Sequence, residues 1–178
     1  MSLRDGCHVC RYDGTGVADG LFWVMNTKID SEHEVFMRRC LGLAKEASDA
    51  GEVPVGALVV RQGEVIASAR NAQIGSCDPT AHAEIIALRA ASLALDNYRM
   101  PGCVLYTTVE PCLMCAGAAL HARVDCVVYG AEEPRAGAAS GRVNYFTEMA
   151  HVHKLTLVGG ILEEDCRYLI QQFFKSRR

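Results

Sequence analysis

Two cysteines, Cys112 and Cys115, follow directly after Pro111 in the stretch EPCLMC. Such a C-x-x-C pair occurs in three settings: half of a structural zinc site, a redox dithiol, or a catalytic metal site that keeps one coordination position open. The three settings differ in where further ligands come from. The fold must therefore bring other residues to these two sulfur atoms, and the rest of the chain indicates which ones.

Two motifs are each expected to begin a helix. Pro111 suits the first helical position, and Cys112 and Cys115, three residues apart, share one face of that helix. The earlier motif TAHAE places His82 and Glu84 in the first turn of another helix. If the strands before these helices are parallel, both helices begin at the same edge of the sheet, where the sites of open α/β sheets form.

This convergence predicts a zinc site made by His82, Cys112 and Cys115. Three protein ligands and a water molecule are typical of catalytic zinc, whereas structural sites close all four positions. Zinc lowers the pKa of its water from about 15.7 to about 7, and Glu84 is the nearest candidate to take up and return the proton. A lone C-x-x-C is a weak signal, and a lone His or Glu at a helix start is usually solvated or capping. Their combination across one strand favours the metal site.

The hydrophobic pattern predicts strands that alternate with helices. Ser31 and Glu34 form a capping box, so a first helix is expected to begin at Ser31. Strands are expected over 55–61, 64–69, 103–109, 126–129 and 155–158, and later helices over 80–95, 111–121 and 163–175. Alternation of this kind indicates a largely parallel α/β sheet covered on both faces, in which the hairpin at Gln62-Gly63 makes one antiparallel pair.

The composition is that of a single domain able to bury a sizeable core in its 178 residues. A net charge of −3 argues against coating nucleic acid by bulk charge, but it is compatible with a local basic patch. No apolar run approaches the roughly 18 residues of a membrane helix, and the opening residues lack the shape of a signal peptide. We therefore expect a cytoplasmic protein without membrane association, in which nine cysteines favour metal or redox sites over disulfides.

The first thirty residues show no clear hydrophobic period. We interpret residues 1–30 as an N-terminal extension, disordered or arising from an added leader or an early start, and residues 31–178 as the compact domain. Cys7-His8-Val9-Cys10 imitates half of a metal site within this extension, and we interpret its cysteines as incidental.

The residues with metal-binding chemistry also carry a resemblance, because H-x-E followed by P-C-x-x-C is the signature of zinc-dependent nucleobase deaminases. The match extends to GEVPVGALVV (51–60), DPTAHAEIIALR (78–89), EPCLMCAGAALHAR (110–123) and the closing FFKSRR. From about residue 33 to the end, the chain resembles the bacterial tRNA-specific adenosine deaminases of the cytidine/deoxycytidylate deaminase-like family.

The resemblance implies a three-layer αβα sandwich around a mixed, mostly parallel five-stranded sheet, with residues 31–178 as the deaminase domain. It implies one Zn²⁺ per subunit, no organic cofactor and a homodimer. The implied reaction converts the wobble adenosine of an arginine tRNA to inosine, with the anticodon stem-loop as partner.

By position, the resemblance assigns His82, Cys112 and Cys115 to zinc and Glu84 to proton transfer. It also assigns residues that would hydrogen-bond the base, line its pocket or contact RNA: Asn71 and the backbone of Ala83, Val55, and Phe174 with Arg177. From the pattern alone, the closing aromatic and basic residues fit an RNA-binding surface and a frayed basic tail equally well; the resemblance favours RNA.

The chain departs from the family pattern at two places. Ala72-Gln73 stands where members often carry Arg-Pro, and Glu132-Glu133 places negative charge in a loop where RNA contacts are expected. Both departures bear on contacts to the anticodon loop and leave the zinc chemistry unchanged.

Three other functions remain compatible with the motifs. The same zinc chemistry serves deaminases of free cytosine, cytidine or guanine, because pocket shape and contacts to exocyclic groups set the substrate. A zinc-stabilised RNA-binding protein without catalysis would not need Glu84. A thiol oxidoreductase would need both cysteines and would not depend on His82.

Overall fold

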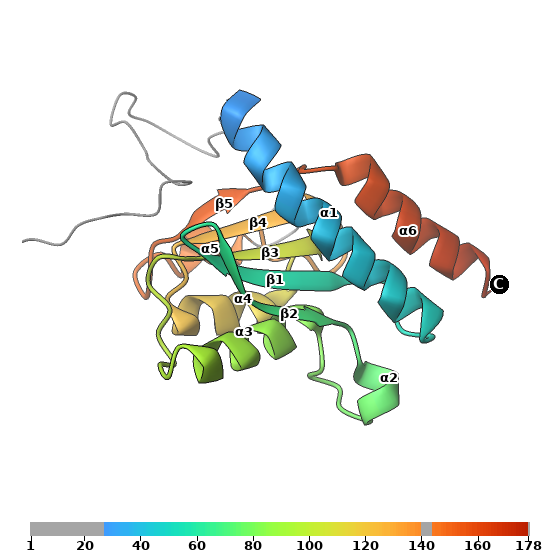
Figure 1. The fold of residues 1–178 in the computed structure, drawn as a ribbon, viewed down its shortest axis with the longest axis horizontal. Coiled ribbons are helices and arrows are strands. Elements are labelled where there is room, and N and C mark those ends of the chain that lie inside the picture. The colour runs from blue at the N-terminus through green and yellow to red at the C-terminus, as the bar shows by residue number, and fades with distance from the viewer. Residues whose placement is uncertain (1–26, 140–143, 178) are drawn as a thin grey trace, which may run out of the picture.

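A computed structural model of the chain describes residues 27–139 and 144–177 (Figure 1). Its elements in chain order are α1 (Thr27–Asp49), β1 (Gly56–Arg61), β2 (Glu64–Arg70), α2 (Gln73–Ser76), α3 (Ala83–Ala94), β3 (Cys103–Val109), α4 (Leu113–Ala122), β4 (Cys126–Ala131), α5 (Tyr145–Glu148), β5 (Thr156–Val158) and α6 (Glu163–Lys175). All five predicted strands are present. The short helices α2 and α5 lie outside the ranges predicted for helices and strands.

The strands form one sheet in the order β2-β1-β3-β4-β5. β1 pairs antiparallel with both β2 and β3, whereas the β3–β4 and β4–β5 pairs are parallel. Four strands therefore run in one direction and β1 runs in the other, which confirms the mixed, mostly parallel five-stranded sheet. The expectation of a single antiparallel pair was wrong, because β1 lies inside the sheet and has an antiparallel neighbour on each side.

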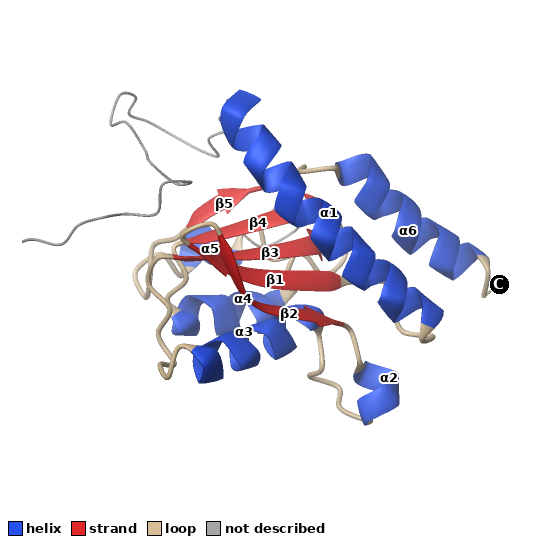
Figure 2. Ribbon diagram, viewed as in Figure 1, coloured by secondary structure: helices blue, strands red, loops and turns tan. Residues whose placement is uncertain are grey.

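Helices cover both faces of the sheet, as predicted for a three-layer αβα sandwich. Figures 1 and 2 show α1 and α6 on one face and α3 and α4 on the other. Side chains alternate between the two resulting cores with the two-residue period of a strand. In β3, for example, Leu105 packs toward α3 and α4, whereas Val104 and Tyr106 pack toward α1 and α6.

Three helix boundaries differ from those predicted. α1 begins at Thr27 and not at Ser31, because residues 27–30 contain no Gly or Pro to stop the helix. α3 begins at Ala83, with His82 in extended conformation as its N-cap residue. α4 begins at Leu113 with Cys112 as its N-cap residue, so Pro111 precedes the helix and does not occupy its first position. Consequently, His82 and Cys112 both lie at the junction between a loop and a helix.

The proposed extension lies largely outside the described residues, as does its Cys7-His8-Val9-Cys10 motif. Within the described part of the chain, no helix is both long enough and apolar enough to cross a membrane.

Close packing of α1 on β1 predicts that Gly56 does not tolerate a side chain. A Cβ atom at Gly56 would lie 2.2 Å from the Cys40 carbonyl oxygen and 2.9 Å from the Ala44 backbone nitrogen. Gly56→Ala should therefore lower the free energy of unfolding by about 1–3 kcal/mol or more, measured by urea denaturation.

Gly42→Ala is the matched control, because a Cβ at this exposed position of α1 meets nothing within 4 Å. The control should raise stability by up to about 1 kcal/mol, since Ala is the better helix former. Equal stabilities of the two variants would contradict the close packing of α1 on β1.

Candidate active site

His82, Cys112 and Cys115 meet at the edge of the sheet where β2 and β3 end. β2 and β3 run in the same direction because each is antiparallel to β1. The helices that follow them, α3 and α4, therefore both begin at this edge. With β1 in between, β2 and β3 are two strand spacings apart, about 9.5 Å, which matches the 8–10 Å distance of packed helices. The sheet thus sets the spacing at which the two helix starts face each other.

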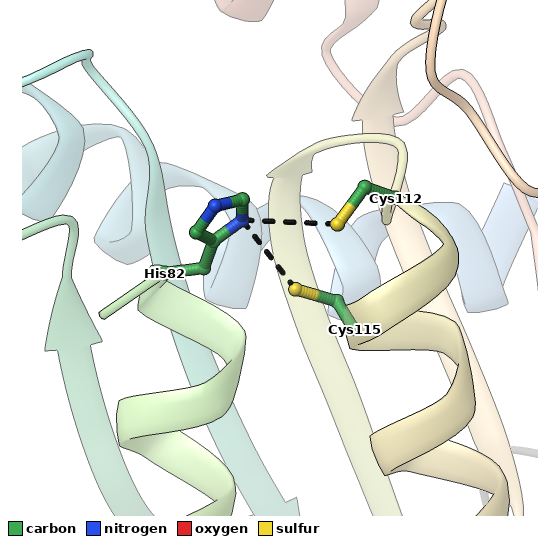
Figure 3. A group of neighbouring side chains, drawn as sticks. All are labelled: His82, Cys112 and Cys115. Atoms are coloured by element: carbon green, nitrogen blue, oxygen red, sulfur yellow. Dashed lines mark hydrogen bonds between the residues drawn. The ribbon is translucent and has the colours of Figure 1, made fainter. Parts of the chain in front are cut away.

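The three side chains point toward one another (Figure 3). The His82 Nδ1 atom lies 3.8 Å from the Cys112 Sγ atom and 3.6 Å from the Cys115 Sγ atom. All three ligand atoms lie within 4.8 Å of one another. The predicted zinc ligands are therefore close together, and one nitrogen and two sulfurs form the ligand set.

These distances fit a zinc ion. For Zn–S bonds of about 2.3 Å and Zn–N bonds of about 2.0–2.1 Å in tetrahedral geometry, a nitrogen and a sulfur ligand are about 3.6 Å apart. The measured distances of 3.8 Å and 3.6 Å agree with this value. Among the described residues, no fourth His, Cys, Asp or Glu belongs to the cluster. The geometry is that of an open site with three protein ligands.

The two thiols have different proton affinities. A hydrogen bond from Cys115, and a second one from His82, lower the pKa of Cys112 to about 4, although burial opposes this shift. The same bond to Cys112, together with burial, raises the pKa of Cys115. The contact between the two cysteines thus favours the thiolate form at Cys112 and the thiol form at Cys115, and a bound divalent cation would favour the thiolate form of both.

Glu84 lies beside this cluster without belonging to it. Its side chain is buried in the first turn of α3, close enough to Cys112 and His82 to interact with their charges. Burial and, to a smaller extent, the charge of Cys112 raise the pKa of the Glu84 carboxyl to about 7. A carboxyl group of this kind can both accept and release a proton near neutral pH. The structure therefore places a carboxyl group suited to proton transfer directly next to the candidate ligands.

Asn71, Ala83 and Val55 lie at the same edge. The Asn71 Oδ1 atom accepts a hydrogen bond of 2.9 Å from the Ala83 backbone N–H, and this bond holds the start of α3. The Val55 carbonyl accepts a bond of 3.0 Å from the Asn71 backbone N–H. The backbone of Ala83 is predicted to hydrogen-bond the base, and in the structure its N–H donates to Asn71. The amide nitrogen of Asn71 is the donor that this arrangement leaves for a ligand.

Phe174 and Arg177 lie at the end of α6, on the opposite face of the sheet from α3 and α4. The Phe174 side chain is 49% exposed. Arg177 donates a hydrogen bond of 2.7 Å to the Gly51 carbonyl and lies over the Phe173 ring at 4.1 Å from its centroid. Because residues 51–55 lead into β1 at the site edge, Arg177 connects α6 to this edge. The Arg177 side chain therefore makes contacts within the protein, and its contact to RNA stays a prediction.

Two buried carboxylates frame the site, and neither was singled out from the sequence. Glu110 accepts bonds of 3.0 Å from the Glu133 N–H and 2.7 Å from the Ala139 N–H, which hold the loop after β4 against Pro111 and Cys112. Glu52 holds α2 in the same way, by accepting bonds from the Ile74 and Gly75 N–H groups. Acidic residues are rarely fully buried unless they are paired. An acidic residue inside an apolar sequence motif was therefore the feature from which these two buried carboxylates could have been predicted.

Gln73 was noted only as a departure from the family pattern. In the structure its side-chain amide lies 3.2 Å from the Nε2 atom of His82. The residue therefore contacts the zinc-ligand candidate on the side of the ring opposite the two sulfurs.

Comparison with known proteins gives a consistent result. Residues 30–131 match the family described as the cytidine and deoxycytidylate deaminase zinc-binding region. The tRNA-specific adenosine deaminase of Haemophilus influenzae is 43% identical over 153 residues, covering 85% of this chain and 88% of the relative.

Two solved structures show the same fold. One comes from a study of A-to-I editing by tRNA:A34 deaminases at the wobble position of transfer RNA; its TM-score is 0.73 at 39% identity, covering 76% of this chain and 98% of the other. The other is a guanine deaminase from Bacillus subtilis, with a TM-score of 0.56 at 43% identity, covering 65% of this chain and 74% of the other.

The geometry predicts that removing any one of the three ligands greatly weakens metal binding. His82→Ala and Cys112→Ser should each leave the purified protein with much less than its normal zinc content, measured by elemental analysis. Cys77→Ser is the matched control, because Cys77 is exposed and lies outside the cluster. Full zinc content in His82→Ala would show that the imidazole is not a ligand.

Proposed function

The chain belongs to the family defined by the cytidine and deoxycytidylate deaminase zinc-binding region, and we propose that it deaminates adenosine to inosine at the wobble position of a tRNA. The reaction is a hydrolysis: water supplies the oxygen that replaces nitrogen at C6, and ammonia leaves. The observation that carries the proposal is the position of Glu84, buried beside a cluster of three ligand atoms within 4.8 Å of one another.

The residues of this site divide the chemistry between them. His82, Cys112 and Cys115 would hold one zinc ion per subunit, and the bound ion acts as a Lewis acid that lowers the pKa of a water molecule. Glu84 takes a proton from the attacking water and returns it to the departing amino group. Its raised pKa, about 7, suits both steps. The buried position of Glu84 also keeps bulk water from competing for the proton.

The base is held by residues at the same edge. The amide nitrogen of Asn71 serves as a hydrogen-bond donor to the purine, and Val55 lines the space beside it. A stacked adenosine cannot reach buried groups, so the target nucleotide must be turned out of its stack. An anticodon loop provides such a nucleotide because its bases are single-stranded. The finer assignment, an arginine tRNA, follows from the family resemblance.

The end of α6 is proposed to contact the RNA around the target. Phe174 presents an exposed ring on which a base can stack, and the cationic side chain of Arg177 lies near the edge of the site. The bond between Arg177 and Gly51 supports this role, because it holds the helix end at the same edge as Val55.

A cytoplasmic homodimer is proposed as the working form. Leu113 and Met114, in the first turn of α4, are 51% and 37% exposed although both are large and apolar. Exposed apolar side chains next to a site are typical of contact surfaces, and this supports a partner subunit at the start of α4.

Deamination of a free base is the second candidate, because the guanine deaminase of Bacillus subtilis shares the fold and 43% of its residues over the matched region. The same zinc ligands and the same proton carrier would serve guanine. The two candidates differ in the substrate and not in the chemistry.

The substrate assay separates these candidates. With an anticodon stem-loop of an arginine tRNA, we expect inosine and ammonia in equal amounts, and no turnover of free adenosine, cytidine or guanine. Glu84→Gln should lower kcat by at least about 10²–10⁴-fold while zinc content is retained, because the amide cannot carry the proton.

Turnover of guanine instead of the stem-loop would replace the tRNA assignment with the second candidate. Binding of the stem-loop without turnover by the zinc-loaded protein would indicate a non-catalytic RNA-binding protein. Undiminished activity of Glu84→Gln would contradict the proton-transfer role.

A further inference from the structure

The second nitrogen of the His82 ring also has a partner. Nδ1 faces the two cysteine sulfurs, and Nε2 lies 3.2 Å from the side-chain nitrogen of Gln73. The same Gln73 nitrogen lies 3.4 Å from the Pro79 carbonyl oxygen, to which it donates. The half-buried Gln73 amide is thus held between the imidazole and the backbone of the loop that precedes α3.

The ring nitrogen of His82 that carries the proton determines whether the Gln73 amide must donate or accept a hydrogen bond. A neutral imidazole carries a proton on only one ring nitrogen. When the Gln73 nitrogen donates to Nε2, Nε2 is an acceptor and the proton is on Nδ1, facing the sulfurs. When Nδ1 instead binds a metal ion, the proton is on Nε2, which then needs an acceptor.

A glutamine side chain can meet both requirements. Half a turn of its terminal amide exchanges the donor nitrogen and the acceptor oxygen at nearly the same position. Gln73 can therefore donate to Nε2 before metal binding and accept from the Nε2 proton afterwards, and in the second orientation it gives up its bond to the Pro79 carbonyl. Proline, which family members often carry at this position, has no side-chain group of either kind.

The backbone around Gln73 is anchored, so that the amide stays within reach of the ring. The buried Glu52 carboxylate accepts bonds of 3.1 Å from the Ile74 N–H and 2.7 Å from the Gly75 N–H. The Ala72 N–H donates to the Ala81 carbonyl at 3.1 Å, directly before His82. Gln73 thus sits between two fixed points, one on α2 and one at the residue preceding the imidazole.

We propose that Gln73 is a positioning residue for the metal centre, which orients the His82 imidazole and fixes the proton on Nε2 so that Nδ1 is free to bind zinc. The inference rests on the zinc site of the proposed function and extends it to a residue outside the family pattern. Groups that accept the remaining N–H of a metal-bound histidine are generally important, and their loss costs about 10–100-fold in metal affinity or activity.

Zinc affinity of two Gln73 variants tests the proposal. Gln73→Leu removes both donor and acceptor, and its zinc dissociation constant, measured by chelator competition, should rise about 10–100-fold. Gln73→Glu supplies an acceptor of similar length, and it should bind zinc at least as tightly as the unaltered protein. Gln172→Leu, on the exposed face of α6, is the matched control and should leave the constant unchanged.

The Co²⁺-substituted proteins provide a second readout, because their visible spectrum reports the ligand geometry directly. Gln73→Leu should change this spectrum and Gln73→Glu should preserve it. An unchanged zinc affinity in Gln73→Leu would overturn the proposal. Equal weakening in both variants would also overturn it, since the residue would then act only by closing the loop at Pro79. The expected pattern of zinc affinities would support the positioning role of Gln73 even if the protein did not deaminate tRNA. The role of Gln73 and the proposed activity on tRNA can therefore be disproved independently.

Discussion

The site depends on one feature of the sheet: β1 is inserted antiparallel between β2 and β3. This insertion makes β2 and β3 run in the same direction, so α3 and α4 begin at one edge. It also sets the two helix starts about two strand spacings apart. His82 from one helix start and two cysteines from the other then meet at metal-ligand distances. Without the intervening strand the two helix starts would be too close to pack, and with two intervening strands the ligands would not meet.

Buried carboxylates hold the loops that surround this edge. Glu52 binds backbone N–H groups of α2, and Glu110 binds those of the loop after β4. Each replaces water with fixed hydrogen bonds, which is how a charged group is accommodated in a protein interior. Burial acts differently on Glu84, whose pKa it raises to about 7. Burial thus has two different results for the three glutamates: two hold the backbone through hydrogen bonds, and the third has a pKa suited to the proposed proton transfer.

Sequence patterns predicted most of this arrangement, because its determinants are local. The spacing within TAHAE and PCLMC and the alternation along the strands identified His82, Glu84, Cys112, Cys115 and all five strands. What they missed depends on pairing between distant segments. The position of β1 inside the sheet, the contact between Gln73 and His82, and the anchoring of loops by Glu52 and Glu110 arise only when the chain is folded. The start of α1 at Thr27 was missed for another reason: Ser31 and Glu34 resemble a helix cap, but nothing before them ends the helix.

The proposed chemistry requires a zinc ion held by three protein ligands, with one coordination position left open. X-ray absorption at the zinc edge, measured on the purified protein, tests it most directly. We expect two sulfur neighbours at about 2.3 Å and two nitrogen or oxygen neighbours at about 2.0–2.1 Å, one from His82 and one from solvent. A third or fourth sulfur neighbour, with no position left for solvent, would identify a closed structural site, which cannot bind the water molecule that the reaction needs.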